Sequence, residues 1–268
     1  MYPILIQVGD HPLPSYVACM LLAGLAALAG LRKLAPALGL KADDYWFFAA
    51  VVGCAGFLGG RFFFLLLHPA EESAGLTENL FSPRQGLATY GALFGLLAGA
   101  GLAAWRLRLS FARTLDYLSV IAPVAHALAR LGCFLTGCCY GRPAGDRLPW
   151  TVVFTDPASA VPADLRGHAL HPTQLYEAGG DLVLAAVLYF LLLPRVEGGV
   201  LPRGLVAAAY LGGYGLLRFA VDVFRGDPEP RFGPGLTLAQ ILSAGAVLAA
   251  VVFVLCTSFA RRRRRLLA

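Results

Sequence analysis

Three arginines lie inside or at the edge of long apolar stretches of this sequence: Arg61, Arg130 and Arg218. An arginine near the centre of a bilayer costs about 2.5–3.5 kcal/mol on insertion scales, so such residues are rare and usually functional. A guanidinium group is planar, stays charged and binds two phosphate oxygens at once. The pattern predicts a site for an anionic ligand, which in a membrane is most simply a phospholipid head group.

Each of these arginines also has a structural interpretation. Arg218 and Asp222 are spaced i, i+4, so they can neutralise one another on one helix face. Arg130 has no acid one turn away, which favours ligand contact for it. Arg61 follows two glycines, and we expect a structural role for it. Arg225 fits an interfacial arginine at a helix end.

The run His171-Pro-Thr-Gln-Leu-Tyr-Glu177 opens another apolar segment. Thr173 or His171 can cap the helix, and Glu177 follows in the first turns, where the helix dipole favours a carboxylate. A helix start does not need the His-Pro pair, however, so a role in a site stays open for His171. Glu177 is a candidate partner for Arg130 or Arg218.

Three tyrosines, Tyr16, Tyr90 and Tyr214, lie in or near the apolar segments. Tyrosines are enriched at both membrane interfaces, so belt residues are one interpretation. A polar contact within the site is the other.

Cys133, Cys138 and Cys139 are the cysteines that invite a metal or redox interpretation. Adjacent cysteines have poor spacing for tetrahedral zinc, for which a C-x2-C pair with further ligands is expected. A Cys133–Cys138 disulfide requires Cα atoms within about 7 Å. Packing of small, soft side chains at a tight helix end is the favoured interpretation, and we expect no metal.

The composition excludes an ordinary soluble protein. Of 268 residues, 58% are hydrophobic and 14% are charged, whereas soluble domains contain about 25% charged residues. A spanning helix needs about 20 apolar residues. Seven segments meet this requirement and predict an all-α membrane protein with a single polytopic domain over residues 1–268: roughly 13–31, 45–67, 87–105, 114–134, 174–193, 203–222 and 237–259.

The basic residues indicate the orientation. Loops one, three and five plus the tail at 260–268 carry 13 of the 22 basic residues, including Arg261 to Arg265. The positive-inside rule places this side in the cytoplasm, and seven spans then place the N-terminus outside. The first residues lack the basic region of a secretory signal, so we expect them to be retained. The outer loop, 135–173, contains a strand-like run from Trp150 to Phe154, which predicts a small ordered periplasmic head.

These stretches, in this order, resemble the phosphatidylglycerol–prolipoprotein diacylglyceryl transferase family. The resemblance covers roughly residues 10–255. The pieces that carry it are Gly59-Gly-Arg61, Tyr90-Gly91, Arg130-Leu-Gly132, His171 to Glu177, and Gly213-Tyr-Gly-Leu-Leu-Arg218 continuing to Asp227. The family likewise has seven spans and an outside N-terminus.

The resemblance implies an activity and a set of site residues. The family moves the diacylglyceryl group of phosphatidylglycerol onto the sulfur of a lipobox cysteine in a prolipoprotein, and glycerol 1-phosphate leaves. Arg130 and Arg218 match the family's two essential arginines, and Tyr90 lies at a catalytic motif position. The expected substrate-binding residues are Arg61, Tyr16, His171, Glu177, Tyr214, Asp222 and Arg225. A multi-pass protein of the bacterial inner membrane is implied.

The chain also departs from the family pattern. The family has His-Gly-Gly where this chain has Tyr90-Gly91-Ala92, and it usually has asparagine at the positions of Cys133 and Thr136. It usually has an acid at Cys138 and glutamate at Asp222. Tyrosine, with a pKa of about 10, is a poorer base than histidine at neutral pH. The departures indicate a divergent branch.

Two other functions fit the same residues. One is a lipid-binding or lipid-moving membrane protein without chemistry, and the other is the same donor chemistry on a different acceptor. No Walker loop, G-x-S-x-G, H-E-x-x-H or dinucleotide-binding motif is present. We therefore expect membrane lipids as partners, with no nucleic acid and no cofactor.

Overall fold

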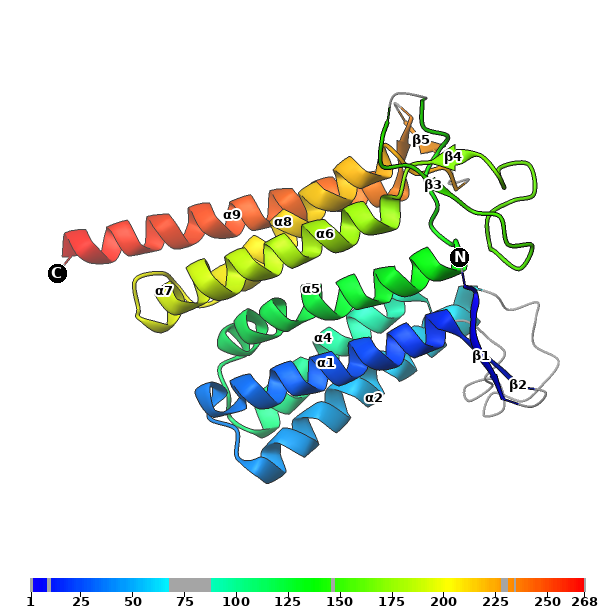
Figure 1. Ribbon diagram of the computed structural model, residues 1–268. Helices are drawn as coiled ribbons and strands as arrows, with labels where there is room; N and C mark the ends of the chain where they lie inside the picture. The colour runs from blue at the N-terminus through cyan, green and yellow to red at the C-terminus, as the bar shows by residue number, and fades with distance from the viewer. Residues whose placement is uncertain are drawn as a thin grey trace. The chain divides into compact units, whose positions relative to one another are not determined.

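Helices make up most of the chain in the computed structural model, which describes residues 2–8, 11–67, 88–145, 148–227, 231–233 and 235–267 (Figure 1). The helices are α1 (Ser15–Leu38), α2 (Ala42–Leu67), α4 (Thr89–Arg106), α5 (Phe111–Thr136), α6 (Thr173–Ala186), the π-helical turn η2 (Val187–Leu192), α7 (Leu193–Glu197), α8 (Leu205–Asp222) and α9 (Leu238–Leu267). Three two-stranded antiparallel sheets pair β1 (Ile4–Val8) with β2 (His11–Pro14), β3 (Val152–Val153) with β4 (Ala169–Leu170), and β5 (Arg231–Phe232) with β6 (Leu236–Thr237).

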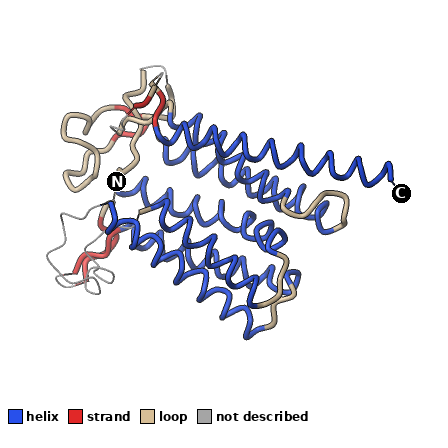
Figure 2. The backbone as a smooth tube through the Cα atoms, turned by 180° about the vertical axis from the view of Figure 1, so that it is seen from behind, coloured by secondary structure: helices blue, strands red, loops and turns tan. Residues whose placement is uncertain are grey.

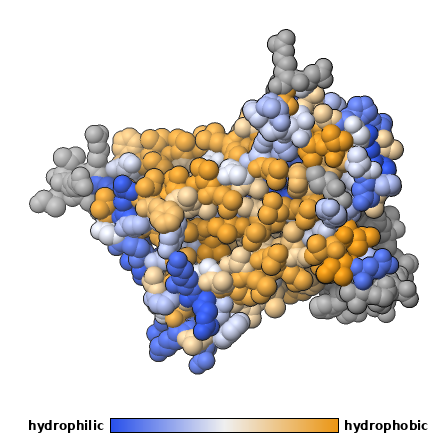
Figure 3. Space-filling model, viewed as in Figure 1, coloured by the Kyte–Doolittle hydropathy of each residue, from blue (hydrophilic) through white to orange (hydrophobic). Residues whose placement is uncertain are grey.

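Six helical segments are long and apolar enough to cross a membrane: Ser15–Leu38, Ala42–Leu66, Phe111–Thr136, Thr173–Glu197, Leu205–Asp222 and Leu238–Arg261. They coincide with six of the seven predicted spans. The remaining predicted span, 87–105, corresponds to α4, which has 18 residues and is not among the six. Hydrophobic residues cover the helices and hydrophilic ones gather at their ends (Figure 3), as expected for helices in lipid.

Contacts between residues divide the chain into two compact units, one of residues 1–30 and 116–268 and one of residues 31–115. In the second unit, α2 and α4 lie side by side (Figure 1). A Cβ atom on Gly95 would lie 2.0 Å from the carbonyl oxygen of Ala55. The two backbones therefore touch, as the i, i+4 spacing of Gly91, Gly95 and Gly99 predicts.

In the first unit, α8 packs between α6 and α9 (Figure 2). The start of α8 is held from α5, because the buried carboxylate of Asp116 accepts hydrogen bonds from the amides of Gly204 at 2.6 Å and Ala207 at 3.0 Å. A carboxylate at this place satisfies amides of the first turn and complements the helix dipole. This contact fixes the axial position of α8 against α5.

A π-helical turn interrupts the segment Thr173–Glu197 at Val187–Leu192, just before Pro194. Proline has no N–H group and its ring clashes with the carbonyl four residues earlier, so a wider turn accommodates it. The helix then continues as α7 and ends at Glu197.

The segment between α5 and α6 has its own small core, made by Tyr140, Phe154, Val161 and Leu170. Strand β3 lies within the apolar run 150–154 and pairs with β4, with Val152 opposite Leu170. The segment also pairs with the chain after α8, because the amide of Arg142 donates to the carbonyl of Phe224 at 2.8 Å. The loop 137–172 is thus tied to the ends of both α6 and α8.

Gly95→Ala should lower the stability of the α2–α4 pair by about 1–3 kcal/mol, because the added methyl group must push two backbones apart. Gly53→Ala on the same helix pair is the matched control, since a Cβ there meets no atom within 4 Å. Thermal unfolding of the purified protein in detergent measures both. Equal effects of the two substitutions would contradict the proposed close approach.

Candidate active site

The buried carboxylate of Glu177 joins three helices. Its Oε1 atom accepts hydrogen bonds from Nη2 of Arg130 on α5 and from the hydroxyl of Tyr214 on α8, both at 2.9 Å. Glu177 itself is on α6 and is only 2% exposed. Of the two partners predicted for Glu177, the structure selects Arg130.

Arg218 lies one turn after Tyr214 on α8, so both side chains are on one helix face. Its Nη2 is 3.2 Å from Oδ1 of the buried Asp222, which confirms the i, i+4 pair. Oδ2 of Asp222 accepts a further hydrogen bond from Thr237 at 2.6 Å. Tyr214 interacts electrostatically with both Arg130 and Arg218. Both guanidinium groups therefore lie near one tyrosine, each beside its own carboxylate.

Arg130 has donor capacity left in this arrangement. Its Nε atom is buried and has no hydrogen-bond partner among the described residues. Its Nη1 donates to the sulfur of Cys139 at 3.4 Å. A buried donor without an acceptor is costly, so this is where an anionic ligand gains most by binding.

A second pair of residues joins α5 and α6, one helical turn away from the Arg130–Glu177 pair. Nδ1 of His126 is 2.7 Å from Oδ2 of the fully buried Asp181. The His126 ring also meets the Tyr214 ring edge-on, with centroids 5.3 Å apart. Neither His126 nor Asp181 is among the site residues predicted from the sequence. Their signal is the spacing, since His126 precedes Arg130 by four residues and Asp181 follows Glu177 by four.

His171 does not cap α6. The residue before the helix is Pro172, no side chain caps it, and the Thr173 hydroxyl instead donates to the carbonyl of Cys139 at 2.8 Å. The predicted caps were therefore wrong, because a loop distant in sequence competes for the same hydroxyl. Nδ1 of His171 is 3.2 Å from the Tyr176 hydroxyl. Burial and the nearby charge of Arg142 lower the pKa of His171 below its ordinary 6.5, so the ring is neutral at pH 7.

The remaining predicted residues fall in three places. Arg225 pairs with Asp227 through a hydrogen bond of 2.7 Å from Nε to Oδ1, just after α8. Tyr16, at the start of α1, lies close enough to interact with Arg130 and the cysteines of the loop after α5. Arg61 on α2 is buried and Tyr90 on α4 is half exposed, and both belong to the other unit.

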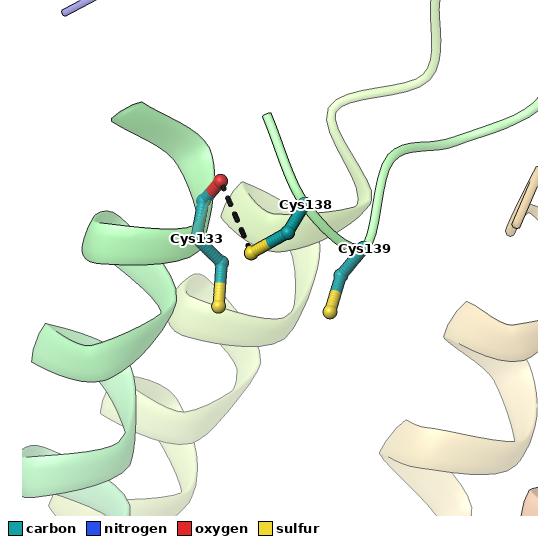
Figure 4. Close-up of side chains that lie close together, drawn as sticks. All are labelled: Cys133, Cys138 and Cys139. Carbon is teal, nitrogen blue, oxygen red and sulfur yellow. Dashed lines mark hydrogen bonds between the residues drawn. The ribbon is translucent and has the colours of Figure 1, made fainter. Parts of the chain in front are cut away.

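Three cysteine sulfurs converge where α5 ends. The Sγ atoms of Cys133, Cys138 and Cys139 all lie within 4.8 Å of one another (Figure 4). All are free thiols, so the Cys133–Cys138 disulfide is not formed. The adjacent Cys138 and Cys139 predict poor metal-ligand spacing. The backbone nevertheless turns sharply here, with φ of +78° at Gly137 and +56° at Cys139, and this turn brings the sulfurs together.

Hydrogen bonds from α6 hold this turn. Thr173 donates to the carbonyl of Cys139, and Nε2 of Gln174 donates to the carbonyl of Cys138, both at 2.8 Å. A Cβ atom on Gly137 would lie 2.2 Å from the Ser159 hydroxyl, so the position requires glycine for space as well as for φ. The neighbouring Cys133 and Cys138 thiols, and then the charges of Arg225 and Arg130, lower the pKa of Cys139.

Taken together, the fold and the site define a polytopic helical membrane protein with a buried pair of arginine–carboxylate ion pairs at one end of its helices. The family model described as "Prolipoprotein diacylglyceryl transferase" matches residues 3–256. The chain belongs to this family.

Several curated relatives are named phosphatidylglycerol–prolipoprotein diacylglyceryl transferase. The protein from Ruegeria pomeroyi is 32% identical and aligns over 90% of this chain and 87% of its own length. The one from Azoarcus is 32% identical over 97% of both chains. The one from Rhodospirillum centenum is 38% identical over 74% of this chain and 69% of its own.

We expect the rate at which Cys139 reacts with iodoacetamide in chelator-treated protein to rise less steeply between pH 6 and pH 8 than that of an ordinary thiol, because its pKa is lowered. An ordinary thiol, with a pKa of about 8.5, reacts close to tenfold faster per pH unit over this range. Peptide mass spectrometry after timed alkylation measures the rate. A tenfold rise per pH unit at Cys139 would refute the assignment.

Proposed function

We propose that this chain transfers the diacylglyceryl group of phosphatidylglycerol to the thiol of a lipobox cysteine in a prolipoprotein, releasing glycerol 1-phosphate. Membership of the family supports the reaction. The observation that carries the site assignment is that Arg130 and Arg218, from different helices, both lie near enough to Tyr214 to interact with it.

The chemistry requires stabilisation of the departing phosphate. The thiolate sulfur of the acceptor attacks the glycerol carbon that bears the phosphate ester. The carbon–oxygen bond breaks, and the electron pair leaves with glycerol 1-phosphate. Guanidinium groups held in place before the reaction stabilise charge that develops on that oxygen, which is often the largest catalytic contribution. We assign this role to Arg130 and Arg218, because a planar fork of donors matches phosphate oxygens.

The carboxylates keep these arginines in position between turnovers. Glu177 and Tyr214 hold Arg130, and Asp222, fixed by Thr237, holds Arg218. We propose that Arg61, Tyr16, His171 and Arg225 complete substrate binding.

We further propose that the chain crosses the bacterial inner membrane seven times, with α4 as the additional span. The basic residues of loops one, three and five then lie in the cytoplasm and the N-terminus lies outside. The segment 137–172 lies on the outer side in this orientation, next to the place where α5 ends and α6 begins.

Three groups can accept the proton of the incoming thiol: Tyr90, the neutral His171, and water. Tyr90→Phe removes only a hydroxyl and so separates the first from the others. A fall in kcat of tenfold or more assigns the proton to Tyr90, whereas unchanged kcat assigns it to His171 or water.

Arg130→Lys and Arg218→Lys should each lower kcat by about 100-fold or more, because lysine keeps the charge but loses the planar pair of donors. Arg166→Lys is the matched control, since Arg166 donates to backbone carbonyls of the loop, at 3.1 Å to Val161 and 3.3 Å to Pro157. Mass spectrometry of a lipobox peptide incubated with phosphatidylglycerol and purified protein measures the thioether product.

The same assay separates the other functions. Movement of labelled lipid between leaflets with no mass shift on the peptide would indicate lipid transport instead. A mass shift on another nucleophile would indicate a different acceptor. Near-normal activity of either lysine variant would contradict the site assignment.

A further inference from the structure

We propose that Cys133, Cys138 and Cys139 bind Zn²⁺ as three thiolates and leave its fourth coordination position to the thiol of the acceptor. The metal site stands on the geometry of the three cysteines. The role of the acceptor rests on the proposed function.

The sulfurs are already close to the spacing that zinc requires. Tetrahedral zinc with Zn–S bonds of about 2.3 Å places its sulfur ligands about 3.8 Å apart. In the structure the three Sγ atoms lie within 4.8 Å of one another, so each sulfur moves by less than about an ångström when the metal binds. Figure 4 shows the side chains of Cys133 and Cys139 pointing in the same direction, with the sulfur of Cys138 between theirs.

Hydrogen bonds from residues of α6 hold the backbone turn that carries Cys138 and Cys139. Cys139 has the left-handed φ of +56°, which is uncommon for a residue other than glycine. The hydrogen bonds of Thr173 and Gln174 to the two cysteine carbonyls hold this conformation. Both donors are buried. A site held this way loses little conformational freedom when it binds a ligand.

The number of ligands favours a reactive site over a structural one. Structural zinc sites are closed by four protein ligands, whereas catalytic sites have three and keep one position open. Among the described residues, the group of converging ligand atoms contains only the three sulfurs. Cys133 is buried, but Cys138 and Cys139 are partly exposed, which leaves a path to the metal.

The surrounding charge also suits this ion. Three thiolates and Zn²⁺ sum to a net charge of −1. Nη1 of Arg130 donates to the Cys139 sulfur at 3.4 Å, which places a positive charge beside the complex and orients a ligand from outside the first coordination sphere. A Cu⁺ ion would also bind three thiolates, but its complex would carry −2 and would need no fourth ligand.

The open position gives the acceptor thiol what the reaction requires. A thiol that coordinates zinc loses its proton outright, and the proton passes to water. The bound thiolate then attacks the glycerol carbon, the carbon–oxygen bond breaks, and glycerol 1-phosphate departs from the arginines with the electron pair. The thioether product is neutral and dissociates from the metal. No oxidant or reductant is needed, and no strong protein base is needed either.

This inference accounts for two departures from the family together. The resemblance implies a histidine at position 90, an asparagine at 133 and an acid at 138, whereas this chain has Tyr90, Cys133 and Cys138. Zinc replaces the function of a base, so a weak base at position 90 is tolerated.

Titration of the full-length purified protein with Co²⁺, a spectroscopic substitute for Zn²⁺, tests the site directly. After chelator treatment, we expect one Co²⁺ per chain, a thiolate-to-cobalt charge-transfer band, and displacement by Zn²⁺. Cys133→Ser, Cys138→Ser and Cys139→Ser should each weaken binding by 100-fold or more. Cys256→Ser, which changes an exposed cysteine on α9, is the control and should bind as the unsubstituted protein does.

A lipobox peptide added to the cobalt form tests the fourth position without any turnover. The cysteine peptide should raise the charge-transfer intensity by about one third, as three thiolate ligands become four, and the serine peptide should not. The absence of a band in the unsubstituted protein, binding of Cu⁺ alone, or equal binding by the serine variants would overturn the metal site. An unchanged spectrum with the cysteine peptide would overturn the role of the acceptor.

Activity measurements keep the two proposals separate. If the metal-free protein and the serine variants form thioether at the full rate, the role of zinc in activating the acceptor fails and the proposed function stands. If zinc-loaded protein forms no thioether on any peptide, the proposed function fails, and the cobalt titration still decides whether the metal site exists.

Discussion

A carboxylate buried among apolar helices must be compensated, and Glu177 meets this requirement by joining α5, α6 and α8. It accepts from both Arg130 and Tyr214, which are far apart in sequence. An uncompensated charge in such surroundings costs several kcal/mol, so the three helices keep the relative positions that preserve these contacts. The His126–Asp181 pair repeats the link between α5 and α6 one turn away. The placement of the arginines depends on this pair of links.

The same need to compensate buried charge explains why each of the two arginines has a carboxylate partner, which keeps the site stable without the proposed phosphate ligand. Arg130 and Arg218 each have a carboxylate, so the unliganded site holds no isolated charge. Arg130 nevertheless keeps a buried Nε donor without a partner among the described residues. A phosphate can therefore gain a strong hydrogen bond without first breaking the Glu177 contact. In the proposed function, Glu177 and Asp222 position the arginines and the arginines contact the ligand.

The loop after α5 connects this charge network to the proposed metal site. Arg130 contacts Glu177 through one nitrogen and Cys139 through another. One guanidinium group therefore contacts both Glu177, which joins the three helices, and Cys139 in the turn after α5. In a transferase, this arrangement would bring the leaving phosphate and the attacking sulfur to opposite sides of the same residue.

Seven apolar spans, the Arg218–Asp222 pair and Glu177 as a candidate partner of Arg130 can be predicted from the sequence, because apolar length and helical spacing are local properties. Six of these spans correspond to helices long and apolar enough to cross a membrane. Three other features emerge only in the folded chain: Thr173 donates to the Cys139 carbonyl instead of capping α6, His126 pairs with Asp181, and three sulfurs converge. Each of these contacts joins segments that are distant in sequence, or depends on backbone angles that composition does not specify. Adjacent cysteines alone predict poor metal-ligand spacing, and the left-handed turn at Gly137 and Cys139, held from α6, is what brings their sulfurs together with Cys133.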